Sequence, residues 1–305
     1  MVRGLLIVLV ISIVVLGIVT WIRAPSSLVR NAIVLVGSPT VIVSWETKYT
    51  QYIILTIPSD VQIEALHGYG SYSIASLWNL DTLEKRHGAL FLPSLVENFA
   101  VPIGWYSTHH ESVGDTNEAI VQFVSTQVSF PSLVKSLFYH SSSLTLIDMI
   151  RVWRATRGID ASTTHVLDFR SHPIGTILAM PDGSATIQFD KQQYDGIVGD
   201  LLEDVLLRKD SIRLAIYNTT TMPGIGARVA RVIEHLGGYV VFVGNDESPY
   251  DGLCELKGSK ERLLSTTSSV IQLLYGCSRV ETTESMRGDL ILKLGKLFEK
   301  RYLPF

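Results

Sequence analysis

The chain has 305 residues, of which 47% are hydrophobic and 18% are charged, and its formal net charge is −3. That apolar content is enough for one or two globular cores, and no internal repeat or low-complexity tract interrupts it. The weak negative charge argues against a nucleic-acid-binding protein, which would need a concentrated basic face.

The amino-terminal segment predicts a membrane anchor. Leu5 to Ile22 contain no charged side chain. A helix of this length, at ~1.5 Å per residue, reaches roughly 27 Å, close to the ~30 Å hydrocarbon core of a bilayer. The run is longer than the ~7–15 apolar residues of a cleaved signal, and Trp21 stands at its end, where an interfacial aromatic residue would lie. We therefore expect a retained transmembrane anchor at 1–23.

The cellular compartment follows from that anchor. Basic residues flank the apolar run on both sides, so the positive-inside rule does not decide the orientation. Because no second span is predicted, everything beyond a short tether at 24–30 should lie on one side of the membrane. Cys254 and Cys277 lack the spacing of a metal site, and an even number of cysteines favours the exported side. We expect a single-pass cell-membrane protein with its bulk outside the cytoplasm.

The region 31–208 predicts a domain of α/β class with a mixed sheet. Runs of apolar and β-branched residues separated by turn residues are typical of strands. Strands are expected at Ala32–Val36, Thr40–Trp45, Tyr52–Ile57, Ile177–Met180 and Ala185–Phe189. Helices are expected at Leu90–Phe99, Thr116–Gln127, Leu144–Thr156 and Gly196–Arg208.

The region 209–300 predicts a small second domain with the element order β-α-β-β-α-β. Its clearest helix begins at Ile225, where apolar residues at i, i+4, i+7, i+8 and i+11 form one stripe, and it ends at Gly237-Gly238. Strands are expected at Ile212–Tyr217, Tyr239–Val243, Leu253–Leu256 and Leu290–Leu294, and a second helix at Lys260–Tyr275. This order is that of ferredoxin-like folds.

A disulfide between Cys254 and Cys277 is expected from this order. Cys254 lies at the start of the third strand of the domain, and Cys277 follows the next helix. A helix that returns over its own strand brings its end beside the beginning of that strand, so the Cα atoms should come within the ~4.4–6.8 Å that a disulfide requires. An exported protein keeps such a bond. The alternative is two buried thiols that behave as small apolar side chains.

The sequence also resembles a known bacterial family. Ile216-Tyr217-Asn218-Thr219-Thr220, with Pro223-Gly224 and Leu236-Gly237 after it, is similar to the C-terminal domain of LytR/CpsA/Psr proteins of the cell envelope. Upstream, the segment 54–60 (ILTIPSD) resembles the catalytic-domain strand that ends in Ile-Pro-Arg-Asp, and 95–103 (LVENFAVPI) resembles a later segment of that domain. The similarity spans most of residues 31–298, and a membrane anchor ahead of the domain is the usual layout of the family.

The resemblance implies a glycopolymer-transfer function, and one substitution in the motif argues against that activity in this chain. Family enzymes transfer glycopolymers from a polyprenyl pyrophosphate carrier to peptidoglycan, with arginines holding the pyrophosphate and magnesium assisting. In this chain Ser59 stands where the first arginine belongs, and a hydroxyl brings no charge, whereas a guanidinium binds phosphate oxygens bidentately. We therefore expect no catalytic residue, no metal and no cofactor, and a binding or scaffolding role at the cell wall.

The alternative is an active glycopolymer phosphotransferase with relocated arginines and magnesium. Its candidate residues are Asp60, Arg151, Arg154 and Arg157. The three arginines are spaced by three and fall within ~120° of a helix circumference, although a solvated helix face is the simpler interpretation. The implied partners are the membrane, cell-wall glycan, a polyprenyl-linked glycopolymer or other envelope proteins, and not nucleic acid. By fold analogy only, the small second domain is a third candidate for glycan binding.

Two further motifs are interpreted as structural. Gly224-x-Gly226 follows a strand, but Val229 replaces the third glycine of a dinucleotide fingerprint, so a tight turn before a helix is expected. The segment His109-His110-Glu111 has the residue types of metal ligands, but adjacent side chains diverge, so we expect a surface loop there.

Overall fold

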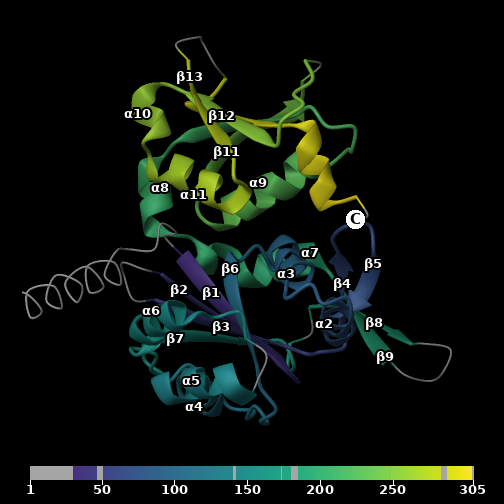
Figure 1. The fold of residues 1–305 in the computed structure, drawn as a ribbon, viewed down its shortest axis with the longest axis vertical. Helices are drawn as coiled ribbons and strands as arrows, with labels where there is room; N and C mark the ends of the chain where they lie inside the picture. Colours follow the sequence, from purple (N-terminus) through teal and green to yellow (C-terminus); the bar gives the residue numbers. More distant parts are fainter. Residues whose placement is uncertain are drawn as a thin grey trace, which may run out of the picture.

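The computed structural model describes residues 30–46, 51–139, 142–172, 174–179, 185–246, 248–282 and 287–303. The predicted anchor at Leu5–Ile22 and the tether lie outside these residues. Among the described residues, no helix is both long enough and apolar enough to cross a membrane. Figure 1 shows two halves that follow one another along the chain. We call residues 30–204 the lower half and residues 205–303 the upper half.

A mixed sheet forms the centre of the lower half (Figure 1). Its strand order is β6-β1-β2-β3-β7. The strands are β1 (Arg30–Val36), β2 (Thr40–Glu46), β3 (Tyr52–Ile57), β6 (Ile103–Thr108) and β7 (Thr164–Asp168). Because β2 is antiparallel to both of its neighbours and the other pairings are parallel, β1, β3, β6 and β7 all end at the same edge of the sheet.

Helices cover both faces of this sheet. One face packs against α2 (Ile74–Leu83), α3 (Phe91–Phe99) and α7 (Lys191–Val198). The other face packs against α4 (Asn117–Gln127), α5 (Phe130–Tyr139) and α6 (Leu146–Thr156). Alternate residues of β1 point to opposite faces of the sheet. Val34 packs in the core beneath α2, α3 and α7, and Ile33 packs in the core beneath α4, α5 and α6. Burial on both faces explains why the predicted strands at β1, β2 and β3 are unbroken apolar runs.

A smaller sheet extends this half beside α2. Its order is β5-β4-β9-β8. Its strands are β4 (Val61–Ala65), β5 (Gly70–Ser73), β8 (Gly175–Ala179) and β9 (Ala185–Phe189). β8 and β9 form the antiparallel pair that the sequence predicts at these positions.

The upper half contains a mixed sheet with the order β11-β10-β14-β12-β13. Its strands are β10 (Arg213–Asn218), β11 (Tyr239–Asn245), β12 (Cys254–Gly258), β13 (Ser278–Glu281) and β14 (Leu290–Leu294). Its helices are α8 (Val205–Asp210), α9 (Ile225–His235), α10 (Lys260–Leu263), α11 (Thr266–Tyr275) and the 3-10 helix η2 (Lys296–Arg301). In Figure 1, α8, α9 and α11 line the side of the upper half that faces the lower half.

The ferredoxin-like arrangement predicted for this region is wrong. A ferredoxin-like sheet places another strand between the two parallel strands of its first β-α-β unit. Here β10 pairs directly with β11 in parallel, with Ile216 opposite Val243. The sheet also contains β13, which the sequence analysis does not predict and which pairs in parallel with β12.

Two predicted helices are broken in the structure. The single helix expected at Gly196–Arg208 is divided into the end of α7, the 3-10 helix η1 (Gly199–Leu202) and α8. Gly199 has φ +48°, and the Asp204 side chain accepts the Leu206 N–H at the start of α8, so a new helix begins there. The helix expected at Lys260–Tyr275 is likewise divided into α10 and α11, because Ser265 caps the amino terminus of α11.

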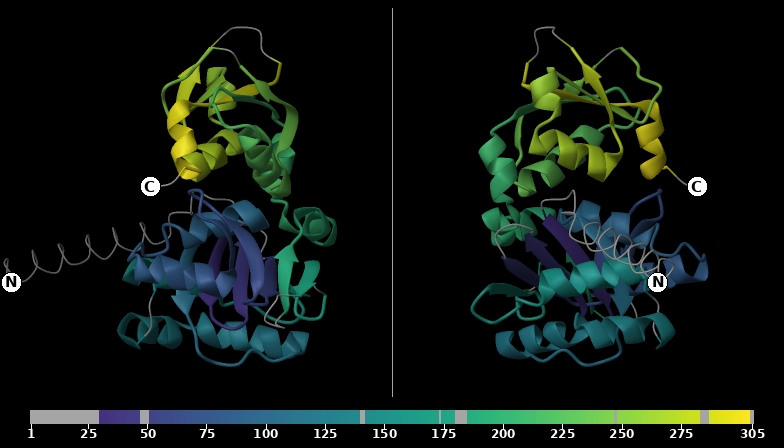
Figure 2. Two further views of the ribbon diagram at one scale, coloured as in Figure 1. Left: turned by 90° about the vertical axis from the view of Figure 1, so that its right-hand side faces the viewer. Right: turned by 60° about the vertical axis from the view of Figure 1, so that its left-hand side comes forward.

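Charged side chains on α9 join the two halves. Arg231 forms a bidentate ion pair with Asp195 of α7, at 2.8 Å and 2.6 Å. Its guanidinium also donates to the backbone carbonyls of Glu97 and Asn98 at the end of α3. One turn earlier on α9, Arg228 pairs with Glu64 of β4 at 2.8 Å. The views in Figure 2 place η2 at the same junction.

The predicted disulfide is present. Cys254 and Cys277 are bonded, and their Cα atoms lie 4.6 Å apart. Cys254 begins β12, and Cys277 lies between α11 and β13, so the chain returns over its own strand as expected. Both residues are buried in the core of the upper half.

Candidate functional site

The candidate site lies at the sheet edge where the parallel strands of the lower half end. In open α/β sheets, ligands bind in the crevice outside the carboxyl ends of the strands. The chain leaves β1 at Val36, β3 at Ile57 and β6 at Thr108, and all three exits meet at this edge. Turn and loop residues from three separate parts of the chain therefore come together there.

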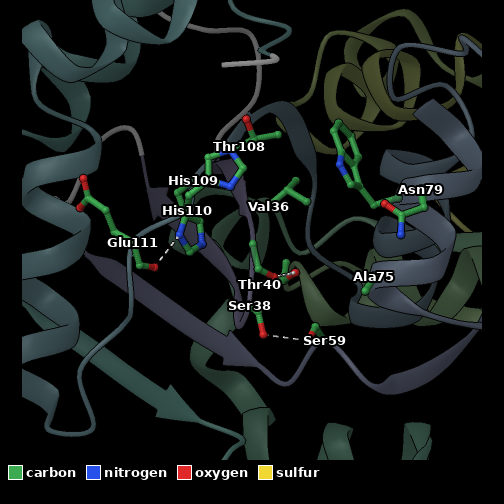
Figure 3. A pocket seen from close by; sticks show the side chains of 12 residues that line it. Val36, Ser38, Thr40, Ser59, Ala75, Asn79, Thr108, His109, His110 and Glu111 are labelled. Carbon is green, nitrogen blue, oxygen red and sulfur yellow. Dashed lines mark hydrogen bonds between the residues drawn. The ribbon is translucent and has the colours of Figure 1, made fainter. Parts of the chain in front are cut away.

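A cavity of about 420 Å³ opens at this edge. Its walls come from the β1–β2 turn, the residue pair after β3, the loop after β6, and one face of α2 (Figure 3). The lining residues are Val36, Gly37, Ser38, Thr40, Ser59, Ala75, Trp78, Asn79, Thr108, His109, His110 and Glu111. The volume falls within the ~300–1,000 Å³ typical of small-molecule sites.

Ser59, the residue that replaces the first arginine of the family signature, is part of this wall. Its hydroxyl lies 3.1 Å from the Ser38 hydroxyl, so one of the two donates to the other (Figure 3). Thr40 donates to the Gly37 carbonyl at 3.2 Å and closes the turn between β1 and β2. Among the residues that line the cavity, none is an arginine or a lysine.

His109 forms the inner part of the wall and is buried, so the surface loop predicted at His109-His110-Glu111 is wrong for this residue. Its Nε2 lies 3.2 Å from the Pro39 carbonyl oxygen, and its Nδ1 lies 3.1 Å from the Glu111 carbonyl oxygen. Burial lowers the pKa of His109, while these two carbonyls act in the opposite direction. Gly37 is required beside it, because a Cβ there would come within 2.3 Å of the ring.

The structure does not bring the phosphotransferase candidates together. Asp60 is exposed on the turn after β3, next to the cavity wall. Arg151 and Arg154 lie on α6 and Arg157 caps its carboxyl end. The Tyr52 hydroxyl donates to the Ala155 carbonyl at 2.9 Å, which places the end of α6 at the beginning of β3. Arg157, at that end of α6, is thus separated from Asp60 by about the length of a six-residue strand, roughly 20 Å.

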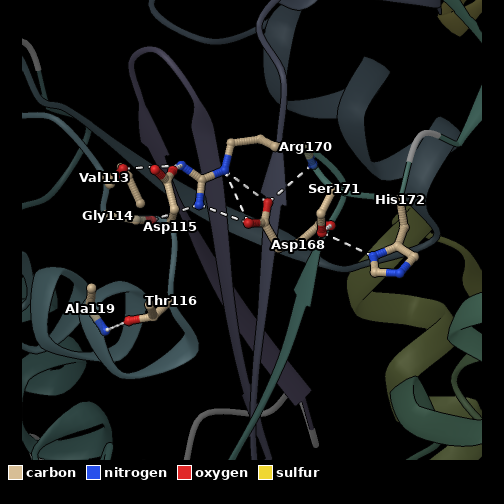
Figure 4. Close-up of polar contacts among 9 residues, drawn as sticks. All are labelled: Val113, Gly114, Asp115, Thr116, Ala119, Asp168, Arg170, Ser171 and His172. Carbon is tan, nitrogen blue, oxygen red and sulfur yellow. Dashed lines mark hydrogen bonds and ion pairs between the residues drawn. The ribbon is translucent and has the colours of Figure 1, made fainter.

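An arginine that the sequence analysis did not select, Arg170, lies at the site edge just after β7. Its guanidinium donates to both carboxylate oxygens of Asp168 and to Asp115 (Figure 4). It also donates to the backbone carbonyls of Val113 and Gly114. An arginine has five N–H donors, and each of these five has an acceptor, so Arg170 holds a loop in place and has no donor left for a ligand.

The polar groups of the cavity wall are mostly neutral. Glu111 lies at the edge of the lining, and its carboxylate points away from the other lining side chains (Figure 3), with one oxygen accepting from the Gln127 amide at 2.8 Å. In the described part of the chain, no three His, Cys, Asp or Glu side chains gather as metal ligands would. The arrangement therefore offers hydroxyl, amide and imidazole groups together with an indole.

Comparisons with known proteins give matches to solved structures at low sequence identity. No family model matches the sequence, and no curated protein sequence matches it. The crystal structure of Bacillus subtilis TagV is 9% identical with a TM-score of 0.42 and covers 68% of this chain and 97% of that chain. A structure described as TagT bound to LI-WTA is 12% identical with a TM-score of 0.42 and covers 58% of this chain and 90% of that chain.

A third structure is described as the LytR-CPS2A-psr family protein YwtF (TagT) with bound octaprenyl pyrophosphate lipid. It is 11% identical with a TM-score of 0.39 and covers 58% of this chain and 90% of that chain. The structural neighbours of this chain are thus LytR-CPS2A-psr proteins, at low identity and over part of its length. This is the family that the sequence motifs resemble.

Proposed function

We propose that this chain is a membrane-anchored protein of the bacterial cell envelope that binds or scaffolds at the cell wall without transferring glycopolymer. The support is the family resemblance of the motifs in 31–298, the apolar run Leu5–Ile22 and the Cys254–Cys277 disulfide, which suits an exported protein. The bulk of the chain would lie outside the cytoplasm.

The observation that carries the non-catalytic part is the charge of the cavity wall. A polyprenyl pyrophosphate presents several negative charges, and proteins stabilise such groups with arginine, lysine or a metal ion. The wall has hydroxyl groups at Ser38 and Ser59, and none of its lining residues is an arginine or a lysine. Arg170 nearby is engaged by acceptors of the protein itself. A pyrophosphate there would find no arginine or lysine among the lining residues to balance its charge.

The test uses the full-length protein in lipid nanodiscs. Isothermal titration with a polyprenyl pyrophosphate should detect no binding, and no product should form with magnesium and a peptidoglycan acceptor. Ser59→Arg should gain affinity by tenfold or more, since a charge-assisted hydrogen bond contributes about 1.5–3 kcal/mol. Ser59→Gln is the matched control, because it adds length without charge. Turnover that disappears in Asp60→Ala or Arg154→Ala would overturn the proposal in favour of the phosphotransferase.

The anchor and the topology have a test of their own. The protein should remain in the membrane fraction after a carbonate wash, because an apolar helix of this length inserts stably. Protease added to intact spheroplasts should remove the mass beyond Arg30, while a cytoplasmic marker stays intact. Release by carbonate would contradict the anchor, and full protection of the chain would contradict the proposed orientation.

A further inference from the structure

One helix of the lower half, α6, has apolar residues on an exposed face as well as on its buried face. The buried residues of α6 are Met149, Val152 and Thr156. Leu146, Ile150 and Trp153 lie at i, i+4 and i+7, so they share a different face of the helix. Leu146 is 63% exposed and Trp153 is 37% exposed. Packing within the lower half therefore does not account for this second face.

Phe130, the first residue of α5, extends the exposed apolar face. Its ring centroid lies 5.6 Å from that of Trp153, and the residue is 41% exposed. Single exposed apolar side chains are normal on a protein surface, but a contiguous set marks a contact surface. We call Phe130, Leu146, Ile150 and Trp153 the outer stripe.

Basic side chains flank the outer stripe. Residues 145–157 contain arginines at 151, 154 and 157, and their one carboxylate is Asp148, which pairs with Arg151 at 3.9 Å. Arg154 and Arg157 are exposed, and no carboxylate among the described residues forms an ion pair with either of them. Apolar and aromatic side chains beside arginines are typical of helices that lie in the plane of a bilayer interface.

The outer stripe lies near the point where the chain enters the sheet. Asn31, Trp45 and Tyr52 are opposite one another on β1, β2 and β3, so the first and the third are about 10 Å apart. The Tyr52 hydroxyl donates to the Ala155 carbonyl of α6 at 2.9 Å. The tether at 24–30 spans at most about 25 Å. The predicted anchor would therefore hold this end of α6 close to the bilayer surface.

We propose that the outer stripe docks on the surface of a bilayer that contains anionic lipid. Phe130 and Trp153 lie at the level of the headgroups, and Arg154 and Arg157 pair with lipid phosphates. The short tether favours a bilayer over a soluble protein as the partner, and the arginines favour anionic lipid. This inference rests on the proposed membrane anchor. It adds a second contact, which fixes the orientation of a lower half that a tether alone leaves free to turn.

The experiment measures the depth of a nitroxide label on the full-length protein in vesicles. The two cysteines of the chain are bonded to each other, so Leu146→Cys gives a single labelling site. The vesicles consist of phosphatidylcholine alone or of equal parts of phosphatidylcholine and phosphatidylglycerol. Collision of the label with oxygen, which partitions into lipid, is compared with collision with a water-soluble nickel chelate. In the anionic vesicles the label at 146 should be accessible to oxygen and protected from nickel.

Leu83→Cys is the matched control for the label. Leu83 is an 80% exposed leucine on α2, and α2 covers the other face of the same sheet. Its label should be accessible to nickel in both kinds of vesicle. A label protected at both positions would mean that the whole lower half is buried in lipid, which would contradict docking through the outer stripe.

Charge variants test the assigned lipid. Replacing both Arg154 and Arg157 by glutamine should lower the ratio of docked to undocked protein about 25-fold, because each basic residue near an anionic surface contributes about fivefold. High salt should lower the ratio in the wild type as well. Glutamine at Arg208 and Arg213 removes the same charge from exposed positions of the upper half and should leave the ratio unchanged. Thermal unfolding confirms that each variant is folded.

Two results would overturn the inference while the protein still floats with the vesicles after a carbonate wash. One is a label at 146 that is as accessible to nickel as the label at 83, which would leave a protein as the partner of the outer stripe. The other is protection at 146 that is equal in neutral vesicles and in the arginine variant. Failure of the proposed anchor is distinct, because the protein would then be released by carbonate.

Discussion

The two halves of the molecule each follow a buried parallel strand with a polar turn, but they use that turn differently. After β3 in the lower half, Ser59 and its neighbours line an open cavity. After β10 in the upper half, the polar turn 218–222 is closed by its own hydrogen bonds. Both turns belong to segments that resemble the same family. Comparing them distinguishes polar groups that the fold uses from polar groups that are open to a ligand.

The upper turn is satisfied internally. The Asn218 side chain accepts from the Thr220 N–H at 3.0 Å and donates to the Met222 carbonyl at 2.9 Å. The Thr219 hydroxyl donates to the Leu294 carbonyl at the end of β14 at 2.8 Å. The Thr221 N–H donates to the Glu299 carboxylate of η2. These residues have a complete structural role, and a ligand is not needed to explain them.

The lower turn has fewer such contacts. Among the described residues, the Ser59 hydroxyl has Ser38 as its hydrogen-bond partner, and the Ser59 backbone carbonyl accepts from the Ala75 N–H at the start of α2. Nothing from the described part of the chain fills the cavity in front of it. A motif residue with an open neighbourhood is a better functional candidate than one whose hydrogen bonds are all used in its own turn, and Ser59 is of the first kind.

The largest effect in this comparison should come from the disulfide of the upper half. Replacing Cys254 and Cys277 by serine removes a link across a sequence separation of 23 residues, and the chain-entropy model gives a loss of roughly 3 kcal/mol in the free energy of unfolding. Denaturant unfolding of the variant and of the reduced wild type should show the same loss. Two free thiols in the unfolded, unreduced wild type would contradict the bond.

The next effect should come from Asn218. Asn218→Ala leaves the Thr220 N–H without its side-chain acceptor and removes one of the two side-chain donors to the Met222 carbonyl, at a buried position, which costs about 1–3 kcal/mol. Thr221→Ala is the matched control, because this exposed neighbour takes part through its backbone N–H. Chemical denaturation measures both. Equal stabilities would show that the upper turn is no more internally satisfied than the lower one.

A pH effect is expected where the lower half joins the upper half. Three buried charged residues lie there: Arg30 at the start of β1, Glu46 at the end of β2, and Asp204 at the amino-terminal cap of α8. Burial, followed by the charge of Asp204, raises the pKa of Glu46 against the opposing effect of Arg30. Burial likewise raises the pKa of Asp204. Both carboxyl groups therefore bind a proton more tightly in the folded state than in the unfolded state.

The sign of this effect follows from linkage. A raised folded pKa contributes stability that is full below the unfolded value, ~4.3 for glutamate, and that is lost as the pH rises through the folded value. Glu46→Gln should remove part of this decline in a series of denaturant midpoints against pH. Glu118→Gln, exposed on α4, should leave the decline unchanged. A midpoint that falls as steeply with pH in Glu46→Gln as in the wild type would contradict the role of the buried carboxyl.

The sequence predicted elements where local pattern and burial agree. β1, β2 and β3 are continuous apolar runs because both faces of the sheet are covered. β6 (IGWYST) was missed, because its alternation is weak and its place is set by pairing with β1. The helix expected across Gly199 and Asp204 was wrong, since a positive φ and a side-chain cap override an apolar pattern.

The candidate site was predictable only in part, for the same reason. Ser59 was found through a motif, but His109 was assigned to a surface loop because the strand before it was not recognised. Once β6 is placed beside β1, the segment after it must meet the β1–β2 turn at the carboxyl edge of the sheet. Arg170 was missed because nothing in its local sequence indicates the loop at 113–115 that it holds.

The smallest effect should be that of Ser59→Ala. The residue is partly exposed, and its side-chain hydrogen bond goes to an exposed hydroxyl, so water can replace the lost partner at Ser38. We expect the free energy of unfolding to change by less than about 0.5 kcal/mol, measured by the same denaturation as for Asn218→Ala. Ser38→Ala should change the free energy of unfolding by a similarly small amount. A loss of more than about 1 kcal/mol in either variant would show that the Ser38–Ser59 pair holds the fold as the upper turn does, and the assignment of this edge to ligand binding would lose its structural basis.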